Sequence, residues 1–119
     1  MNIHTANILN EFPNTAEEID ISRKKITGIL DLKKFNNLKK LNCKKNLITD
    51  LINLPESLEY LVCAYNKISN LDNLPNNLIE LYCAHNKISN LDNLPNNLKE
   101  LDCSDNLITL LDYLPSSLE

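Results

Sequence analysis

The sequence repeats itself every twenty residues, and this period limits what the chain can fold into. Cys43, Cys63, Cys83 and Cys103 recur at that interval. Columns of Leu, Asn, Ile and Leu-Pro accompany them, so that the unit reads L-x-x-L-x-C-x-x-N-x-I-x-x-L-x-x-L-P-x-x. Because so short a unit can bury its apolar residues only against copies of itself, the repeat predicts a stack of coils around one continuous core.

The pattern inside each unit predicts how a coil runs. The Leu-x-Cys pair, such as Leu61 and Cys63, has the period of two of a strand with one buried side. The alternation stops at the Asn, which predicts a strand of about four residues that turns there. The Asn amide can bond backbone groups of its own coil and of the next one, since a buried turn leaves peptide groups unpaired. The remaining residues include Pro and are too few for a helix, so we expect them to be extended or tightly turned.

The unit resembles the leucine-rich repeat signature L-x-x-L-x-L-x-x-N/C-x-L over about four-fifths of the chain, with Cys in the second strand position. The unit length and the L-P-x-x-L connector are similar to those of the short repeats of bacterial effectors. This resemblance implies an α/β fold, a right-handed solenoid with a parallel β-sheet on its concave face and an irregular or polyproline-like convex side. The abundance of Asn, Lys and Ile also makes the chain similar to mimivirus-like repeat proteins of giant DNA viruses.

We expect two parts in the chain. Residues 19–119 form the repeat domain of about five coils, of which the first is degenerate and has Lys24 in the Asn column. Residues 1–18 lie outside the repeat. Their apolar positions predict a short amphipathic helix that covers the N-terminal end of the core, and these positions are Ile3, Ile8, Leu9 and Phe12.

The last unit is incomplete at the C-terminus. It leaves Leu111, Leu114 and Leu118 at an end of the core with unpaired strand edges. An uncovered end indicates either that the natural protein is longer or that this end meets another chain. We expect contact between chains there, which would give a homo-oligomer.

Four cysteines in a small chain suggest a zinc site, two disulfides or a column of buried free thiols along the stack. Coils about 4.8 Å apart would spread the four sulfurs over roughly 14 Å, whereas zinc needs all its ligands within about 2.3 Å. Disulfides need Cβ atoms about 3.5 to 4.5 Å apart, which is closer than neighbouring coils. We therefore predict four buried free thiols that act as apolar fillers, with no metal and no cofactor.

Free thiols also predict a reducing compartment. The N-terminal residues lack the basic start and apolar run of a secretory signal, and no apolar stretch approaches the roughly 18 residues needed to cross a bilayer. We expect a cytoplasmic protein without membrane contact, in the host cytoplasm if the chain is viral or an effector.

The net charge of −4 conceals an uneven distribution. Residues 23–45 contain nine of the twelve basic residues and one acidic residue, Asp31, so this segment carries +8 and the rest −12. Such asymmetry can steer a charged partner or order neighbouring chains, although a run of lysines is usually a solvated face. Few aromatic residues accompany the lysines and the overall balance is acidic, so nucleic acid is not an expected partner.

The residues between and after the fixed Leu and Cys face outward on the concave side, and they vary where the rest of the unit barely changes. Successive coils present lysines, then aromatic residues beside alanines, then acids. Amphipathic aromatics flanked by opposite charges are typical of a binding centre, although Tyr is also simply a good strand residue. The predicted partner-binding residues are Lys40, Lys44, Lys45, Tyr60, Val62, Tyr65, Glu80, Tyr82, His85, Glu100, Asp102 and Asp105.

These patterns favour a protein-interaction scaffold that binds an unidentified protein and is not an enzyme. A structural or self-assembly element acting through the uncapped end is the alternative. Effectors with similar repeats can carry a ubiquitin ligase with a Cys-x-Asp nucleophile, and Cys103-Ser104-Asp105 has that spacing. A substrate-recognition part of such a ligase is therefore a remote alternative, although a thiol in the buried column is not activated. Neither His4 nor His85 has a metal-ligand or catalytic partner at a recognisable spacing.

Overall fold

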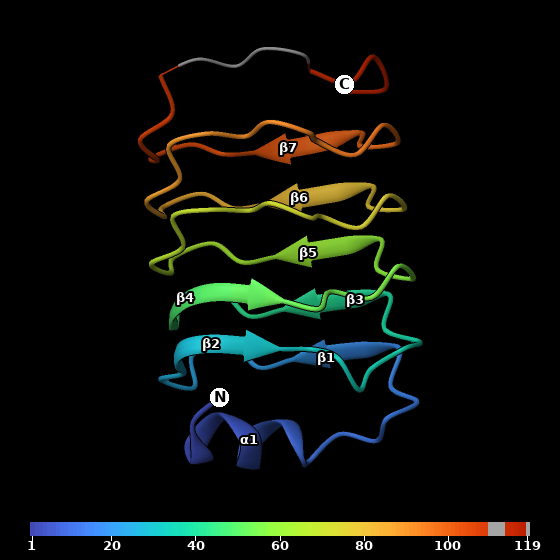
Figure 1. Ribbon diagram of the computed structural model, residues 1–119, viewed down its shortest axis with the longest axis vertical. Helices are drawn as coiled ribbons and strands as arrows, with labels where there is room; N and C mark the ends of the chain where they lie inside the picture. The colour runs from blue at the N-terminus through green and yellow to red at the C-terminus, as the bar shows by residue number, and fades with distance from the viewer. Residues whose placement is uncertain (110–113, 119) are drawn as a thin grey trace.

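The computed structural model describes residues 1–109 and 114–118 as a stack of coils with a helix at its N-terminal end (Figure 1). The main sheet is parallel and takes one strand from each of five successive coils, which we number 1 to 5. Its strands are β1 (Glu18–Asp20), β3 (Lys40–Asn42), β5 (Tyr60–Val62), β6 (Glu80–Tyr82) and β7 (Glu100–Asp102). This arrangement confirms the predicted solenoid, with strands of three residues rather than about four.

The register of the main sheet repeats the sequence columns. Ile19 pairs with Leu41, Leu41 with Leu61 and Leu61 with Leu81, so the fixed leucines lie above one another. Leu41, Leu61 and Leu81 are fully buried and belong to one hydrophobic core that runs along the stack. The first coil, although degenerate in sequence, therefore joins the stack in the predicted register.

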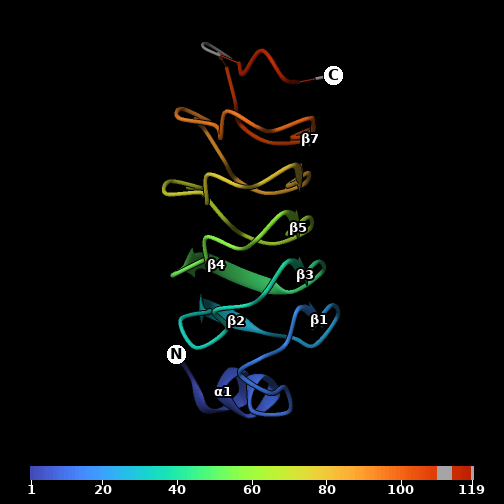
Figure 2. The same ribbon diagram turned by 90° about the vertical axis from the view of Figure 1, so that its right-hand side faces the viewer.

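A second sheet lies on the opposite side of the stack from the main sheet (Figure 2). It is parallel and consists of β2 (Thr27–Asp31) and β4 (Leu47–Ile52), in coils 1 and 2. The prediction of an irregular convex side was therefore wrong for these two coils. In coils 3 and 4 the structure describes the segments equivalent to β2 and β4, and they contain no strand, as predicted.

The residues of these segments account for the difference. Coils 1 and 2 have β-branched Thr27, Ile29 and Ile52 in the second sheet, and such residues favour strands. Coils 3 and 4 have Asn at the equivalent turn, where Asn70 accepts a hydrogen bond from the backbone N–H of Asp72 at 2.7 Å. Such a local bond competes with strand pairing, so the backbone turns instead.

The Asn column carries the turn that follows each strand of the main sheet. Asn66 donates to the carbonyl oxygens of Cys63 in its own coil and Cys43 in the preceding coil, at 3.1 and 3.0 Å. The oxygen of the same side-chain amide, Oδ1, accepts from the backbone N–H of Ile48 at 2.9 Å. The sequence predicted bonds to the coil itself and to the next coil, but the side chain reaches back to the preceding one.

Helix α1 (Ile3–Leu9) lies beneath the first coil (Figure 1). The Asn2 side chain caps it by accepting from the backbone N–H of Thr5 at 2.8 Å. Leu9 is 1% exposed within the core, and Ile8 and Phe12 pack partly against it. Ile3 is 80% exposed, so it does not belong to the apolar face that the sequence predicted. It stands in the first turn, ahead of the part of the helix that meets the core.

The predicted open end falls partly outside the described residues. Leu111 lies outside them, Leu114 is 45% exposed and Leu118 packs partly against the core. No helix in residues 1–109 and 114–118 is long and apolar enough to cross a membrane.

Candidate functional site

The outer face of the main sheet, which we call the sheet face, carries eleven of the twelve predicted binding residues in three rows that run from coil 2 to coil 5. The twelfth, Lys44, directly precedes Lys45 on coil 2. Strand register sets the first two rows, because residues at equal positions on neighbouring strands lie side by side. The first row is Lys40, Tyr60, Glu80 and Glu100. The second row is Asn42, Val62, Tyr82 and Asp102. The structure therefore brings the predicted residues together on one surface.

The third row lies just after the strands and consists of Lys45, Tyr65, His85 and Asp105. All four have positive φ, between 52° and 58°. Non-glycine residues adopt this left-handed conformation at a cost of about 1 to 2 kcal/mol. The amides of Lys45, Tyr65 and His85 still donate to the following coil, as that of Tyr65 does to the Ala84 carbonyl at 2.9 Å. The turn thus fixes the backbone of the row and aligns its side chains.

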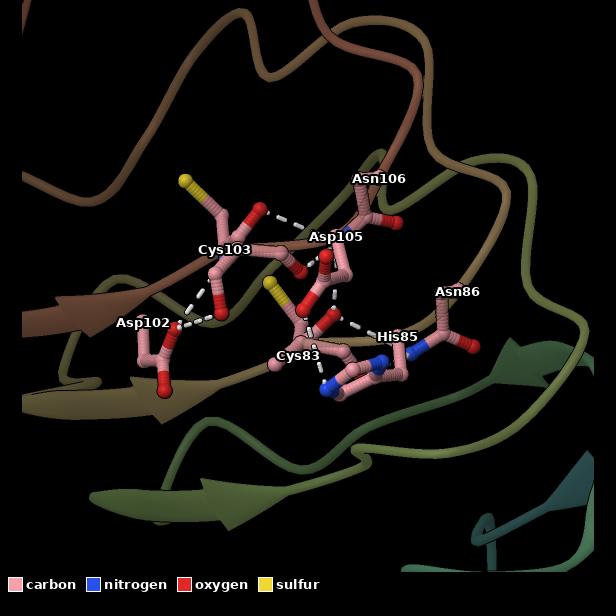
Figure 3. Close-up of polar contacts among 9 residues, drawn as sticks. Cys83, His85, Asn86, Asp102, Cys103, Asp105 and Asn106 are labelled. Atoms are coloured by element: carbon pink, nitrogen blue, oxygen red, sulfur yellow. Dashed lines mark hydrogen bonds and ion pairs between the residues drawn. The ribbon is translucent and has the colours of Figure 1, made fainter.

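Side chains of the third row contact one another from coil to coil. The Lys45 ammonium lies 5.3 Å from the centre of the Tyr65 ring, a cation–π distance. The Tyr65 ring stacks on His85 with centroids 4.1 Å apart and an interplanar angle of 16°. His85 Nε2 lies 3.1 Å from Asp105 Oδ2, and Figure 3 shows these side chains facing each other. The row therefore runs from a cation through two rings to a carboxylate.

Tyr82 occupies the centre of the sheet face between two carboxylates. Its hydroxyl lies 2.7 Å from Glu80 Oε1 and 2.5 Å from Glu100 Oε2. The hydrogen bond to Glu100, followed by that to Glu80, raises the pKa of Tyr82 far above its ordinary value. A phenol has one proton to donate, so Tyr82 serves one carboxylate at a time. The other carboxylate then has room for a further donor.

The tyrosines form two separate aromatic pairs. Tyr60 and Tyr82 are tilted by 55° with centroids 5.6 Å apart, and Tyr65 pairs with His85. Tyr65 is 48% exposed, whereas Tyr60 and Tyr82 are half-buried. The three tyrosines therefore lie at two places on the face.

Opposite charges flank these pairs. Lys40, Lys44 and Lys45 stand on coil 2, and Lys40 makes an exposed ion pair with Glu18 at 3.8 Å, which contributes little to stability. Asp102 and Asp105 stand on coil 5. Hydrogen bonds from the Ser104 hydroxyl and then its backbone N–H hold the pKa of Asp102 below its ordinary value, so this end is acidic at neutral pH.

A hollow on the same face had no signal in the sequence. It has a volume of about 350 Å³ and lies over β1 and β3, between Glu18, Asp20, Lys40 and Tyr60. Its walls come from side chains that are far apart in the chain and are brought together only by the register. The sequence could name these residues as outward-facing but could not indicate a depression among them.

The cysteines point into the core rather than onto the sheet face. All four are free, and Cys43, Cys63 and Cys83 are buried. Burial raises the pKa of Cys43 and of Cys83 to about 12 and that of Cys63 well above its ordinary value. Cys103 is half-buried, which corrects the prediction of four buried thiols. Cys83 lies in a coil with a main-sheet neighbour on each side, whereas Cys103 lies in coil 5, which carries the last strand of the main sheet.

The arrangement does not favour Cys103 as a nucleophile. Desolvation raises its pKa, whereas a reactive cysteine needs a lowered one. Figure 3 shows its sulfur turned away from the Asp105 carboxylate, which contacts His85 instead. Among the described residues, no three His, Cys, Asp or Glu side chains are placed to hold a metal ion.

A scan of the sequence against protein-family models finds no match, and a search of curated proteins finds none either. Solved structures do match. The leucine-rich repeat domain of a Shigella effector superposes with a TM-score of 0.81 and 30% sequence identity, over 98% of this chain and 50% of its own. YopM from Yersinia enterocolitica WA-314 superposes with a TM-score of 0.56 and 29% identity, over 71% of this chain and 23% of its own.

This chain therefore spans half the length of the Shigella chain and 23% of that of YopM. The two structures named here come from bacteria. They agree with the similarity to bacterial-effector repeats and give no support to a viral origin.

Proposed function

Because this chain is a leucine-rich repeat protein of the bacterial-effector type, we propose that its sheet face binds a protein partner. The likeness to effector repeat domains supports a protein-interaction domain in general. The choice of the sheet face rests on one observation: two aromatic pairs stand at its centre, between the lysines of coil 2 and the acids of coil 5. Aromatic residues with a polar group are enriched at the energetic centres of interfaces.

The chemistry of the face defines what such a partner offers. Tyr60, Tyr65 and Tyr82 provide rings of which part remains accessible, so apolar or aromatic partner side chains can cover them. The basic and acidic ends call for a partner that is acidic at one end and basic at the other. Opposite charges of this kind raise the association rate and fix the orientation more than they raise affinity.

The test replaces Tyr60, Tyr65 and Tyr82 together by Ala. The matched control replaces three exposed residues outside the sheet face, Lys67, Asn76 and Asn96, by Ala. Thermal melts followed by circular dichroism verify that both variants fold. Proteins retained by the immobilised wild-type chain are then identified by mass spectrometry, and their binding to each variant is measured with purified components.

We expect the tyrosine variant to lose at least about tenfold in affinity for these proteins, and the control to bind as wild type does. Equal binding by both variants would exclude the sheet face as the binding surface.

A further inference from the structure

Along the rows of the sheet face, basic residues stand at one end and acidic residues at the other. This order is complementary to that of a second copy of the same face turned end for end. We propose that two copies of this chain form an antiparallel dimer, sheet face to sheet face. The two-fold axis runs parallel to the strands, between coils 3 and 4. This inference takes the sheet face as a binding surface, as the proposed function does, and names a second copy as one occupant of it.

The direction of the axis decides which residues meet. A two-fold axis along the strands reverses the order of the coils and leaves each row opposite itself. Coil 2 then lies over coil 5 of the second copy, and coil 3 lies over its coil 4. Every contact occurs twice, because the interface is the same patch on both subunits.

The charged ends match under this operation. In the third row, Lys45 faces Asp105 of the second copy. In the first row, Lys40 faces Glu100 of the second copy. The lysines thus meet acids at both ends of the interface, which favours association and fixes its register.

The centre matches as well. Tyr65 faces His85 of the second copy, so two ring pairs meet. Tyr60 faces Glu80 of the second copy. Its phenol can donate to that carboxylate whenever Tyr82 donates to Glu100 instead, and so fills the hydrogen-bonding capacity that Tyr82 leaves open.

The other face-to-face symmetry is unfavourable. An axis along the stack keeps each coil opposite itself and reverses the rows, so Lys45 would face Lys40 and Asp105 would face Glu100. Like charges placed opposite each other in an interface cost several kcal/mol. The charge pattern therefore selects the antiparallel arrangement.

The shape of the face permits this contact but limits its strength. Figure 2 shows the strands of the main sheet rising in a nearly straight line, so two faces can approach along their length. Strands about 4.8 Å apart and rows spread over about six residues give a patch roughly 20 Å on a side. Specific interfaces bury about 800 Å² on each partner, so we expect a weak dimer, with a dissociation constant between about 1 and about 100 μM.

The test uses sedimentation velocity of the purified chain over a range of concentrations, at about 0.05 M and about 0.5 M salt. We expect a monomer–dimer equilibrium that weakens at the higher salt concentration. Lys45→Glu and Asp105→Lys should each raise the dissociation constant at least about tenfold, because each puts two like-charge contacts into the dimer.

Mixing the two variants should restore the dimer. In the mixed dimer, the carboxylate introduced by Lys45→Glu faces the ammonium introduced by Asp105→Lys. The second of the two symmetry-related contacts is then the unchanged pair of Lys45 and Asp105. Lys67→Glu and Asp72→Lys make the same charge changes at exposed positions outside the sheet face and should behave as wild type. Restoration also shows that both variants are folded, since an unfolded chain cannot complement.

A wild-type chain that stays monomeric up to about 0.5 mM at low salt would overturn the dimer, because the expected affinity would populate it there. A mixture that fails to associate would overturn the proposed arrangement. Either result leaves the tyrosine test of partner binding unaffected. Conversely, equal partner binding by the tyrosine variant and its control would count against partner binding alone and would leave the charge-reversal experiment valid. The failure of one proposal can thus be distinguished from the failure of the other.

Discussion

At the scale of the single residue, Asn66 shows how one side chain holds a turn between two coils. Its amide nitrogen lies within hydrogen-bonding distance of three carbonyl oxygens, its amide oxygen accepts from one backbone N–H, and the residue is only 8% exposed. Buried peptide groups need partners, and no strand supplies them at this turn. The same bonds recur at Asn46, Asn86 and Asn106. A polar residue at this position is therefore part of the core rather than an exception to it.

Replacing Asn66 by Ala should lower the free energy of unfolding by about 2 to 4 kcal/mol, because the backbone groups that it bonds lose a partner while still buried. Urea unfolding followed by circular dichroism measures the change. Asn76→Ala, an exposed Asn in a loop, should change stability by less than about 0.5 kcal/mol. Equal effects of the two substitutions would contradict a structural role for the column.

Tyr82 is the residue whose titration reports the geometry of the sheet face. Glu100→Gln replaces the carboxylate whose hydrogen bond contributes most to the shifted pKa by a neutral, weaker acceptor, so the pKa of Tyr82 should fall towards its ordinary value. The folded state holds this proton more tightly than the unfolded state does. Stability from this site is therefore present below the ordinary tyrosine pKa and is lost as the pH rises through the raised one.

Absorbance at about 295 nm during an alkaline titration measures tyrosine ionisation, with Tyr82→Phe identifying the signal of Tyr82. Glu56→Gln, which lies outside the sheet face, serves as the control. If Glu100→Gln left the Tyr82 titration where it is in the wild type, the contact between the two side chains would be absent in solution.

At the scale of the element, helix α1 covers one end of the core through few contacts. Leu9→Ala should cost about 2 to 5 kcal/mol, since Leu9 is fully enclosed beside coil 1. Ile3→Ala in the same helix should cost less than about 0.5 kcal/mol, because Ile3 is exposed. Thermal and urea unfolding of the pair measure the difference. A similar loss for both would mean that Ile3 also packs against the core.

The elements that sequence predicts well are those with a repeated pattern. The strands of the main sheet follow from the Leu-x-Cys alternation, which persists even where coil 1 has Ile19 and Ile21 instead. The second sheet was missed because its formation depends on a few β-branched residues in two coils rather than on the repeat. The apolar residues of α1 predicted a helix in this segment, but the exposure of Ile3 depends on the angle at which the helix meets the core.

The candidate site was predicted to a similar degree. Its twelve residues follow from the outward positions of the repeat, and the strand register places seven of them side by side on the main sheet. Contacts such as the Tyr65–His85 stack could not be predicted, because they depend on the left-handed turn at each position of the third row. The hollow over β1 and β3 depends on side-chain packing, which a pattern of residue types does not describe.

At the scale of the whole molecule, each coil contacts only its neighbours, so parts of such a stack can open separately. The four cysteines, one in each of coils 2 to 5, report such opening. The desolvation that raises the pKa of Cys43 and Cys83 to about 12 suppresses the reactive thiolate while the coils stay closed. Because the folded state raises these pKa values, the stack loses stability as the pH rises above the ordinary cysteine pKa.

We therefore expect iodoacetamide at about pH 8 to modify Cys103 at least about tenfold faster than the other three thiols, because Cys103 alone is half-buried. Peptide mass spectrometry of samples quenched over time gives the rate at each site. In about 8 M urea all four should react at similar rates, which controls for local sequence effects. Cys103→Ser should remove the fast phase and leave the slow one. If Cys43 reacted as fast as Cys103 in the folded protein, coil 2 would open as readily as coil 5, and the core would not be continuous along the stack.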